Sequence, residues 1–271
     1  MISNINYVKK VMGDLKAKKK FGQNFLIDSN VVDKIAKNAC DIDCKTIEIG
    51  PGLGALTEML LKYSKSVDAY EIDEDMYEIL MGEFKDEERL KVYLEDFMNT
   101  NLDIYKDQKI RVCSNLPYYV TTPILFKLFE SDLDIELITV MVQKEVADRF
   151  KAEIGSEDYN ALSIIVQYLY DVKLEMNVSK NVFYPAPKVD SAVISFKPKR
   201  ERDYEFEKRF FGLVKNCFRM RRKTLNNNLK DIASKEDIER MFRETGLKES
   251  VRAQELSLDD YLKMNEVLYE R

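Results

Sequence analysis

The segment Asn115-Leu116-Pro117-Tyr118 places an amide, a proline and an aromatic ring side by side, directly after the apolar run 110–113. Proline cannot continue a strand ladder, so the chain should turn out of a sheet here and project Asn115 and Tyr118 over its edge. An amide oxygen and a proline-flanked carbonyl can accept both hydrogens of an exocyclic amino group, while an aromatic ring stacks on a purine. The segment predicts a purine site, with a strand-ending turn and a core tyrosine as the alternative.

A glycine-rich turn lies earlier in the chain, where residues Glu48 to Gly54 read E-x-G-x-G-x-G. Glycine lets the backbone approach a ligand closely where a strand leads into a helix. Because the glycines alternate, and do not follow G-x-G-x-x-G, the turn favours a nucleoside-type methyl donor over a dinucleotide. Glu71 and Asp96 end the next two predicted strands, where α/β sheets bind ligands, and Glu71 is placed to bind a ribose diol. We therefore expect a nucleoside cofactor; a merely tight turn is the alternative.

Histidine is missing from the sequence, and the cysteines are few: Cys40, Cys44, Cys113 and Cys217. Without histidine, Ser-His and Cys-His nucleophilic catalysis and histidine general bases are excluded. A structural zinc site needs about four ligands, and only one close cysteine pair exists, so we expect no metal. Any catalysis must work without a side chain whose ordinary pKa lies near neutrality.

Short apolar runs alternate with segments of helical spacing through most of the chain. The predicted strands are 46–50, 67–72, 90–94, 110–113 and 137–142, and then 172–178 and 189–196. The alternation predicts a parallel sheet covered on both faces, and the last two strands, nearly consecutive, predict an antiparallel edge. The expected fold class is α/β, with a Rossmann-like, mostly parallel sheet.

After Pro198 no strand candidate remains, and apolar residues such as Phe206, Phe210 and Val214 recur at helical spacing. This change predicts two domains. Residues 1–198 would hold the sheet and a basic N-terminal arm, and residues 199–271 would form a small all-α domain.

Basic residues are concentrated in two blocks, although the net charge is −5. Such blocks can contact several phosphates of a nucleic acid, whereas charge alone is equally compatible with a solvated helix face. The candidates for RNA contacts are Lys18, Lys19, Lys20, Arg219, Arg221, Arg222 and Lys223.

The composition, with 45% apolar and 34% charged residues in a chain of 271, is that of a soluble globular protein. No apolar run reaches the roughly 18 residues of a membrane span, and no signal-peptide stretch begins the sequence. We expect a cytoplasmic monomer with no membrane partner.

Taken together, six segments resemble the KsgA (RsmA) family of bacterial 16S ribosomal RNA adenine dimethyltransferases. They are Lys20 to Leu26, Glu48 to Thr57, Asn115 to Tyr118, Gln143 to Val146, Phe183 with Pro185 to Ala192, and Arg221 to Leu225. The resemblance implies a class I methyltransferase sheet and S-adenosylmethionine as the cofactor. It also implies dimethylation of two adjacent adenines near the 3′ end of 16S RNA, within an immature small ribosomal subunit.

The resemblance also implies the roles of individual residues. It assigns cofactor contacts to Asn24, Leu26, Gly50, Glu71, Asp96 and Asn115, to which the glycine turn adds Gly52. It assigns the target adenine to Asn115, Leu116, Tyr118 and Phe183. Phe183 begins an aromatic-proline loop that can close a base pocket or simply pack.

Three other functions fit parts of the sequence. A large-subunit methylase of the macrolide-resistance type typically carries isoleucine where this chain has Leu116. A ribosome-assembly factor could keep the pocket and act mainly by binding. A nicotinamide-dependent oxidoreductase would normally show G-x-G-x-x-G and would need a substrate acid or base. Leu116, the intact Asn115 to Tyr118 segment and the arginine-rich C-terminal block favour the small-subunit enzyme.

Overall fold

The computed structural model describes residues 2–14, 24–199 and 201–269, and these divide into two compact units. The first unit comprises Met1–Ala147 and Val172–Pro198, and the second comprises Asp148–Asp171 and Lys199–Arg271. Lys18, Lys19 and Lys20 lie outside the described residues. No helix among the described residues is long and apolar enough to cross a membrane.

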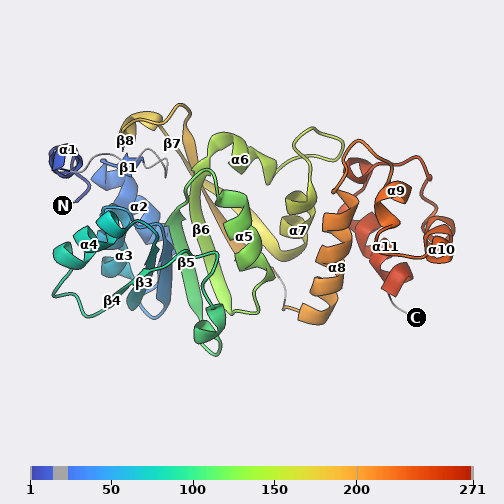
Figure 1. The fold of residues 1–271 in the computed structure, drawn as a ribbon, viewed down its shortest axis with the longest axis horizontal. Coiled ribbons are helices and arrows are strands. Elements are labelled where there is room, and N and C mark those ends of the chain that lie inside the picture. Colours follow the sequence, from blue (N-terminus) through green and yellow to red (C-terminus); the bar gives the residue numbers. More distant parts are fainter. Residues whose placement is uncertain (1, 15–23, 200, 270–271) are drawn as a thin grey trace. The chain divides into compact units, whose positions relative to one another are not determined.

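The first unit is built around a seven-stranded sheet of order β4-β3-β2-β5-β6-β9-β7 (Figure 1). Its strands are β2 (Lys45–Ile49), β3 (Ser66–Glu71), β4 (Leu90–Leu94), β5 (Ile110–Asn115), β6 (Ile135–Gln143), β7 (Tyr170–Val178) and β9 (Ser191–Pro198). Strands β2 to β6 pair in parallel, and β9 pairs antiparallel with β6. The expected fold class is confirmed.

The register of the parallel strands brings their carboxyl ends to one edge. Ile49 of β2 lies opposite Tyr70 of β3, and the amide of Gly50 donates to the Tyr70 carbonyl over 2.9 Å. Since β5 also pairs with β2, the residues that follow β2, β3 and β5 emerge together. This edge is where the predicted site residues leave the sheet.

Helices cover the sheet of the first unit, and their bounds are α1 (Ile5–Asp14), α2 (Ser29–Ala39), α3 (Ala55–Tyr63), α4 (Glu74–Glu83), α5 (Thr121–Glu130) and α6 (Lys144–Arg149). Asp28 begins α2 by accepting hydrogen bonds from the amides of Asn30 and Val31. Helix α2 packs against α3 and against β5 and β6, which buries apolar side chains such as Ile35 and Leu60. The burial of these apolar side chains stabilises the sheet that carries the site.

Shorter elements complete the two units. A two-stranded antiparallel sheet joins β1 (Phe25–Leu26) to β8 (Phe183–Tyr184), and 3-10 turns span Leu102–Tyr105, Lys180–Val182 and Ala253–Glu255. The second unit consists of α7 (Ala161–Leu169), α8 (Tyr204–Cys217), α9 (Leu225–Leu229), α10 (Lys235–Thr245) and α11 (Leu258–Tyr269).

The sequence predicts a single domain boundary after Pro198. In the structure, residues 148–171 group with the C-terminal helices. The reason is aromatic packing, because Tyr168 of α7 lies 5.0 Å from Phe210 of α8 between ring centroids. Tyr159 adds a hydrogen bond from its hydroxyl to the Leu256 carbonyl at 3.0 Å.

Candidate active site

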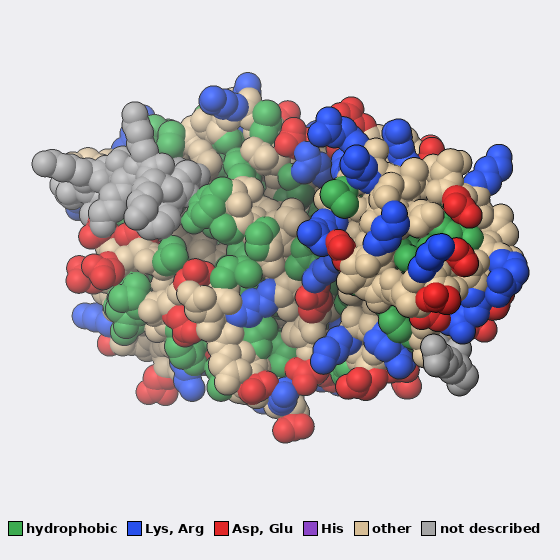
Figure 2. Space-filling view, turned by 45° about the vertical axis from the view of Figure 1, so that its right-hand side comes forward, with side chains coloured by type: hydrophobic (Ala, Val, Ile, Leu, Met, Phe, Trp, Pro, Cys, Tyr) green, Lys and Arg blue, Asp and Glu red, His purple; other side chains and the backbone are tan. Residues whose placement is uncertain are grey.

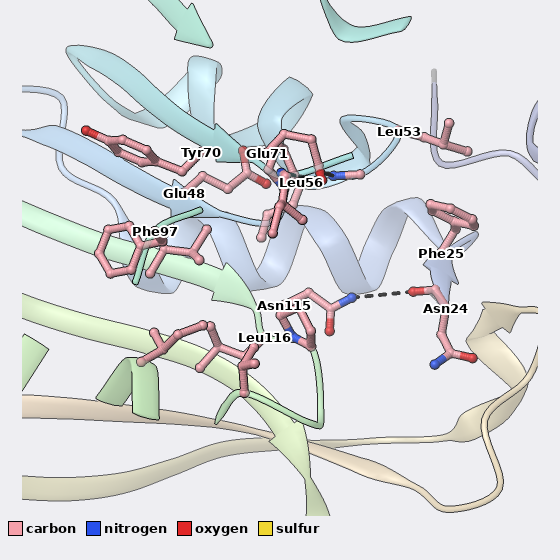
Figure 3. Close-up of a pocket in the computed structure, with 18 of the residues that line it drawn as sticks. Asn24, Phe25, Glu48, Leu53, Leu56, Tyr70, Glu71, Phe97, Asn115 and Leu116 are labelled. Carbon is pink, nitrogen blue, oxygen red and sulfur yellow. Dashed lines mark hydrogen bonds between the residues drawn. The ribbon is translucent and has the colours of Figure 1, made fainter. Parts of the chain in front are cut away.

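A pocket with a cavity volume of about 210 Å³ opens at the carboxyl edge of the sheet (Figure 3). The segments that follow β2, β3, β4 and β5 form most of its wall, and the N-terminal segment with α1, β1 and single residues of α3 and α5 contribute the rest. The main stretches are Asn24–Leu26, Glu48–Leu53, Tyr70–Ile72, Glu95–Met98 and Asn115–Val120. The structure therefore brings together all the residues predicted for the cofactor and for the target base except Phe183.

The glycine turn between β2 and α3 depends on glycine for steric reasons. Gly54 has φ +87°, and a Cβ placed there would lie 2.7 Å from the Phe84 ring and 2.8 Å from Leu80. Gly52 has φ +57°, and its Cβ would lie 3.2 Å from the Phe25 ring. Side chains rarely adopt this left-handed backbone, so the turn can follow its tight course only with glycine.

Glu71, the last residue of β3, holds that turn from the adjacent strand. One carboxylate oxygen accepts from the Gly52 amide at 3.0 Å, and the other accepts from the Ile72 and Asp73 amides at 2.9 Å each. Burial raises the pKa of Glu71, and these backbone hydrogen bonds oppose that rise. A carboxylate has about four acceptor sites, so Glu71 retains capacity for a ligand hydroxyl.

Glu48 is a second buried carboxyl in the pocket wall, and the sequence did not single it out as a site residue. Its side chain accepts a hydrogen bond from the Thr57 hydroxyl at 2.6 Å. Burial raises the pKa of Glu48 to about 8; the Thr57 hydrogen bond opposes this, and the charge of Glu71 adds to it. The group thus carries its proton at neutral pH, which limits the negative charge beside Glu71.

This raised pKa gives a testable pH dependence of stability. Between the ordinary value of 4.5 and about 8, folded Glu48 keeps a proton that the unfolded chain releases, so rising pH lowers the free energy of unfolding in this window. Glu48→Gln removes this titrating group and with it the pH dependence. We therefore expect the stability of the variant relative to the wild type to increase from about pH 5 to about pH 9. Urea unfolding of both proteins across this range measures the difference; a difference independent of pH would contradict the assignment.

Asn115 ends β5, and its side chain crosses to the wall formed by Asn24. The Asn115 amide nitrogen faces the Asn24 carbonyl at 3.5 Å (Figure 3). Because a carbonyl can only accept, this contact fixes the nitrogen of Asn115 as the end that points to Asn24. The Asn115 side-chain oxygen is then the end that can accept a hydrogen bond from a ligand.

The turn after Asn115 is held on both sides. The Leu116 amide donates to the Met141 carbonyl at 3.1 Å, and the Pro117 carbonyl accepts from the Thr121 hydroxyl at 3.1 Å and the Val120 amide at 3.2 Å. Since helix α5 uses the Pro117 carbonyl in this way, the carbonyl of Leu116 is the proline-flanked acceptor that remains for a ligand.

Tyr118 lines the pocket with a half-buried ring, as the sequence predicts. Its hydroxyl lies 2.9 Å from the hydroxyl of Ser191, a buried residue at the start of β9. Burial raises the pKa of Tyr118, and the Ser191 contact opposes the rise, so the phenol is neutral. The ring is available for stacking and is tied at its polar end.

Phe183 does not line the pocket. It lies opposite Leu26 in the β1–β8 pair, is 3% exposed and belongs to the hydrophobic core that includes Val32 and Leu60. The packed alternative for its loop is the one observed, because pairing with β1 turns the ring into the core. Phe183 supports Leu26, which does line the pocket.

Apolar pocket residues that the sequence did not single out include Ile2, Val8, Ile72, Phe97, Met98 and Tyr119. Ile72, Phe97 and Met98 directly follow the acidic residues Glu71 and Asp96, which was the available signal. Ile2 and Val8 belong to the N-terminal segment, where no motif points to a pocket. Among the described residues, no group of three His, Cys, Asp or Glu side chains is arranged to hold a metal.

The basic residues of the second unit differ in their contacts. Arg219 forms an ion pair with Asp231 at 2.5 Å, and Arg221 donates to the carbonyls of Glu157 and Tyr159 at 2.5 and 3.3 Å. Arg222 and Lys223 are exposed. Figure 2 shows many Lys and Arg side chains on the visible face of this unit. The sequence located the block but not these differences.

A parallel sheet of this strand order, with a nucleoside pocket beside a glycine turn and an antiparallel strand near one edge, defines the class I S-adenosylmethionine-dependent methyltransferases. A sequence model of the family described as "Ribosomal RNA adenine dimethylase" matches residues 14–270. The chain belongs to this family. The resemblance seen in the sequence, the enzyme class and the cofactor are thereby confirmed, and the oxidoreductase alternative is contradicted.

Individual relatives agree with this membership. The chain is 43% identical over 267 residues to "Ribosomal RNA small subunit methyltransferase A" of Lactobacillus helveticus, covering 92% of this chain and 90% of that protein. It is 40% identical over 264 residues to the protein of the same name from Staphylococcus aureus, covering 92% and 89%.

Solved structures show the same fold. A dimethyladenosine transferase from Plasmodium falciparum is similar with TM-score 0.72 and 25% identity, covering 89% of this chain and 95% of that one. The 23S rRNA methyltransferase ErmE is similar with TM-score 0.65 and 24% identity, covering 90% and 99%.

Proposed function

We propose that this protein transfers methyl groups from S-adenosylmethionine to N6 of adenines in 16S ribosomal RNA, dimethylating two adjacent adenines near the 3′ end. The substrate is RNA within an immature small ribosomal subunit, and the enzyme acts as a monomer in the cytoplasm, where ribosomes assemble. The observation that carries the proposal is the convergence of Glu71, Asn115 and Tyr118 on one pocket.

The pocket residues fit the cofactor. Glu71 would accept hydrogen bonds from the ribose diol, and Gly50 and Gly52 let the backbone approach the ligand closely. Asp96, which lines the pocket beyond β4, would accept from the 6-amino group of the cofactor's adenine. When bound, S-adenosylmethionine supplies a methyl group on a positively charged sulfur.

The target amino group must be activated, because the N6 lone pair of adenine is conjugated into the ring. The Asn115 side-chain oxygen and the Leu116 carbonyl would accept its two hydrogens and localise the lone pair on nitrogen. The Tyr118 ring would stack on the base and stabilise the positive charge that develops there. The methylated nitrogen is then a strong acid that loses its proton to water, so no histidine is needed.

Alignment would supply most of the rate acceleration, for which about 7 to 11 kcal/mol is available in favourable cases. A base within structured RNA must leave its stack to enter such a pocket. Arg222 and Lys223 of the second unit would meanwhile hold the phosphate backbone.

The choice of small-subunit RNA rests on Leu116 and on the names of the curated relatives. The test is transfer of radiolabelled methyl groups to undermethylated small subunits, with large subunits and free 16S RNA as comparison substrates. We expect label in the small subunits. Label only in large subunits would favour the macrolide-resistance type, and binding without transfer would favour an assembly factor.

The exposed arginine and lysine give a prediction for RNA binding. Arg222→Ala combined with Lys223→Ala should weaken binding to small subunits and reduce the salt slope by about 1 to 2, because two phosphate contacts are lost. Binding titrations at several salt concentrations measure the slope. Lys235→Ala with Arg243→Ala, on α10 of the same unit, is the control. An equal loss in this control would show a general effect of charge.

A further inference from the structure

The loop that follows β4 supplies one wall of the pocket with Asp96, Phe97 and Met98. Two hydrogen bonds fix Asp96 within this loop. Its carboxylate accepts from the Met98 amide at 2.9 Å, and its backbone carbonyl accepts from the Asn99 amide at 2.8 Å. These local bonds set the shape of the loop. They do not attach it to the rest of the pocket.

Two contacts join the loop to β3: the Glu95 amide donates to the Glu71 carbonyl at 2.9 Å, and the Phe97 ring packs edge-on against Tyr70. Lys127 joins the loop to α5. Its ammonium donates to three backbone carbonyls of the loop, those of Phe97 at 2.7 Å, Met98 at 2.9 Å and Thr100 at 2.7 Å. An ammonium has three hydrogens, so these bonds use its full donor capacity. Each bond is charge-assisted and stronger than a neutral hydrogen bond. The same nitrogen lies 5.4 Å from the centre of the Phe97 ring.

The surroundings of Lys127 are consistent with a fixed ammonium. Burial lowers the pKa of Lys127, and the nearby charges of Asp96 and Glu95 oppose that change. Lys127 itself does not line the pocket. Any effect on the cofactor must therefore act through the loop.

Helix α5 also holds the turn proposed for the target base. Its first residue, Thr121, donates to the Pro117 carbonyl, and Lys127 lies further along the same helix. A single rigid element thus connects Pro117 beside Tyr118 with the loop that carries Asp96. The turn that carries Tyr118 and the loop that carries Asp96 are thus both bound to α5. A common rigid support suits a reaction whose rate depends on the alignment of its two substrates.

We propose that Lys127 is a positioning residue for cofactor recognition, which holds the Phe97, Met98 and Thr100 carbonyls so that Asp96 faces the 6-amino group of the cofactor's adenine. This inference rests on the proposed function, because it assumes that the pocket binds S-adenosylmethionine. It predicts a role in selectivity for the base, beyond support of the fold.

The test is Lys127→Met, which removes the ammonium and keeps an unbranched apolar side chain. Calorimetry would measure the affinity for S-adenosylhomocysteine and for S-inosylhomocysteine, whose base carries a 6-oxo group. For Lys127→Met we expect about tenfold weaker binding of S-adenosylhomocysteine, as for loss of a hydrogen-bonded charge. The ratio of the affinities for S-adenosylhomocysteine and S-inosylhomocysteine should fall toward one. The KM for the cofactor should rise in proportion, while kcat at saturating cofactor changes by less than about threefold.

Lys109→Met is the matched control, because Lys109 is an exposed lysine just before β5, at the opposite edge of the sheet. It should leave both affinities unchanged. If Lys127→Met does not fold, as judged by circular dichroism, Lys127→Gln replaces it, since one amide cannot satisfy three carbonyls.

The outcomes separate this inference from the proposed function. Failure of the wild type to bind S-adenosylhomocysteine would overturn the proposed function. Wild-type binding with unchanged affinities in the Lys127 variant would overturn the role of Lys127. An equal loss of affinity for both ligands would also overturn it, because a purely structural role would not alter the preference between adenine and hypoxanthine.

Discussion

Tyr118→Ala should lower kcat for methyl transfer by about 100-fold and leave the affinity for S-adenosylhomocysteine within about twofold of the wild type. The ring is the stacking surface for the target base, and without it the base is no longer held in line with the methyl donor. Single-turnover methylation of undermethylated small subunits measures the first quantity, and calorimetry measures the second.

Tyr118→Phe is the matched control, because it keeps the ring and removes only the hydroxyl that contacts Ser191. One net hydrogen bond corresponds to a loss of about two- to tenfold, so this variant should retain most of its turnover. If phenylalanine were as damaging as alanine, the hydroxyl and not the ring would carry the function. Unchanged methylation by Tyr118→Ala would remove the residue from the mechanism.

Glu71→Ala should weaken binding of S-adenosylhomocysteine by about 10- to 100-fold, the effect of losing one charge-assisted hydrogen bond to a ribose hydroxyl. The substitution also leaves the amides of Gly52, Ile72 and Asp73 without their acceptor, which loosens the glycine turn. Calorimetry measures the affinity, and the ligand-induced rise in melting temperature gives a second measurement.

Glu74→Ala serves as the control for Glu71→Ala. Glu74 is an exposed acidic residue at the start of α4, three positions along the chain. It should bind the ligand as the wild type does. A loss of less than about threefold in Glu71→Ala would mean that the ribose is recognised elsewhere.

The sheet could be predicted because its signals are local. Apolar runs ending at Glu71 and Asn115 mark strands whose polar last residues reach the ligand edge, and the glycine turn marks the crossover into α3. The strands observed agree with those expected to within a few residues. The last residue of each predicted strand could therefore be assigned to the site, since parallel strands bring their carboxyl ends together in space.

The remaining features depend on contacts between distant residues. Phe183 has an aromatic ring that could stack on a base, yet its pairing with Leu26 places the ring in the core. Arg221 belongs to a basic block, yet the Glu157 carbonyl, 64 residues away, takes one of its donors. Lys127 carries no motif, and its three acceptors lie 27 to 30 residues earlier. Sequence patterns do not report such long-range partners.

The wall formed by Ile2 and Val8 bears on the design of inhibitors. Both residues line the pocket and pack near Phe25 and Leu53, yet they precede residue 14, where the match to the family begins. A nucleoside analogue that occupies the shared ribose and base positions would inhibit many methyltransferases. An apolar extension from such a compound toward Ile2 and Val8 would bury hydrocarbon against a wall that lies outside the segment matching the family.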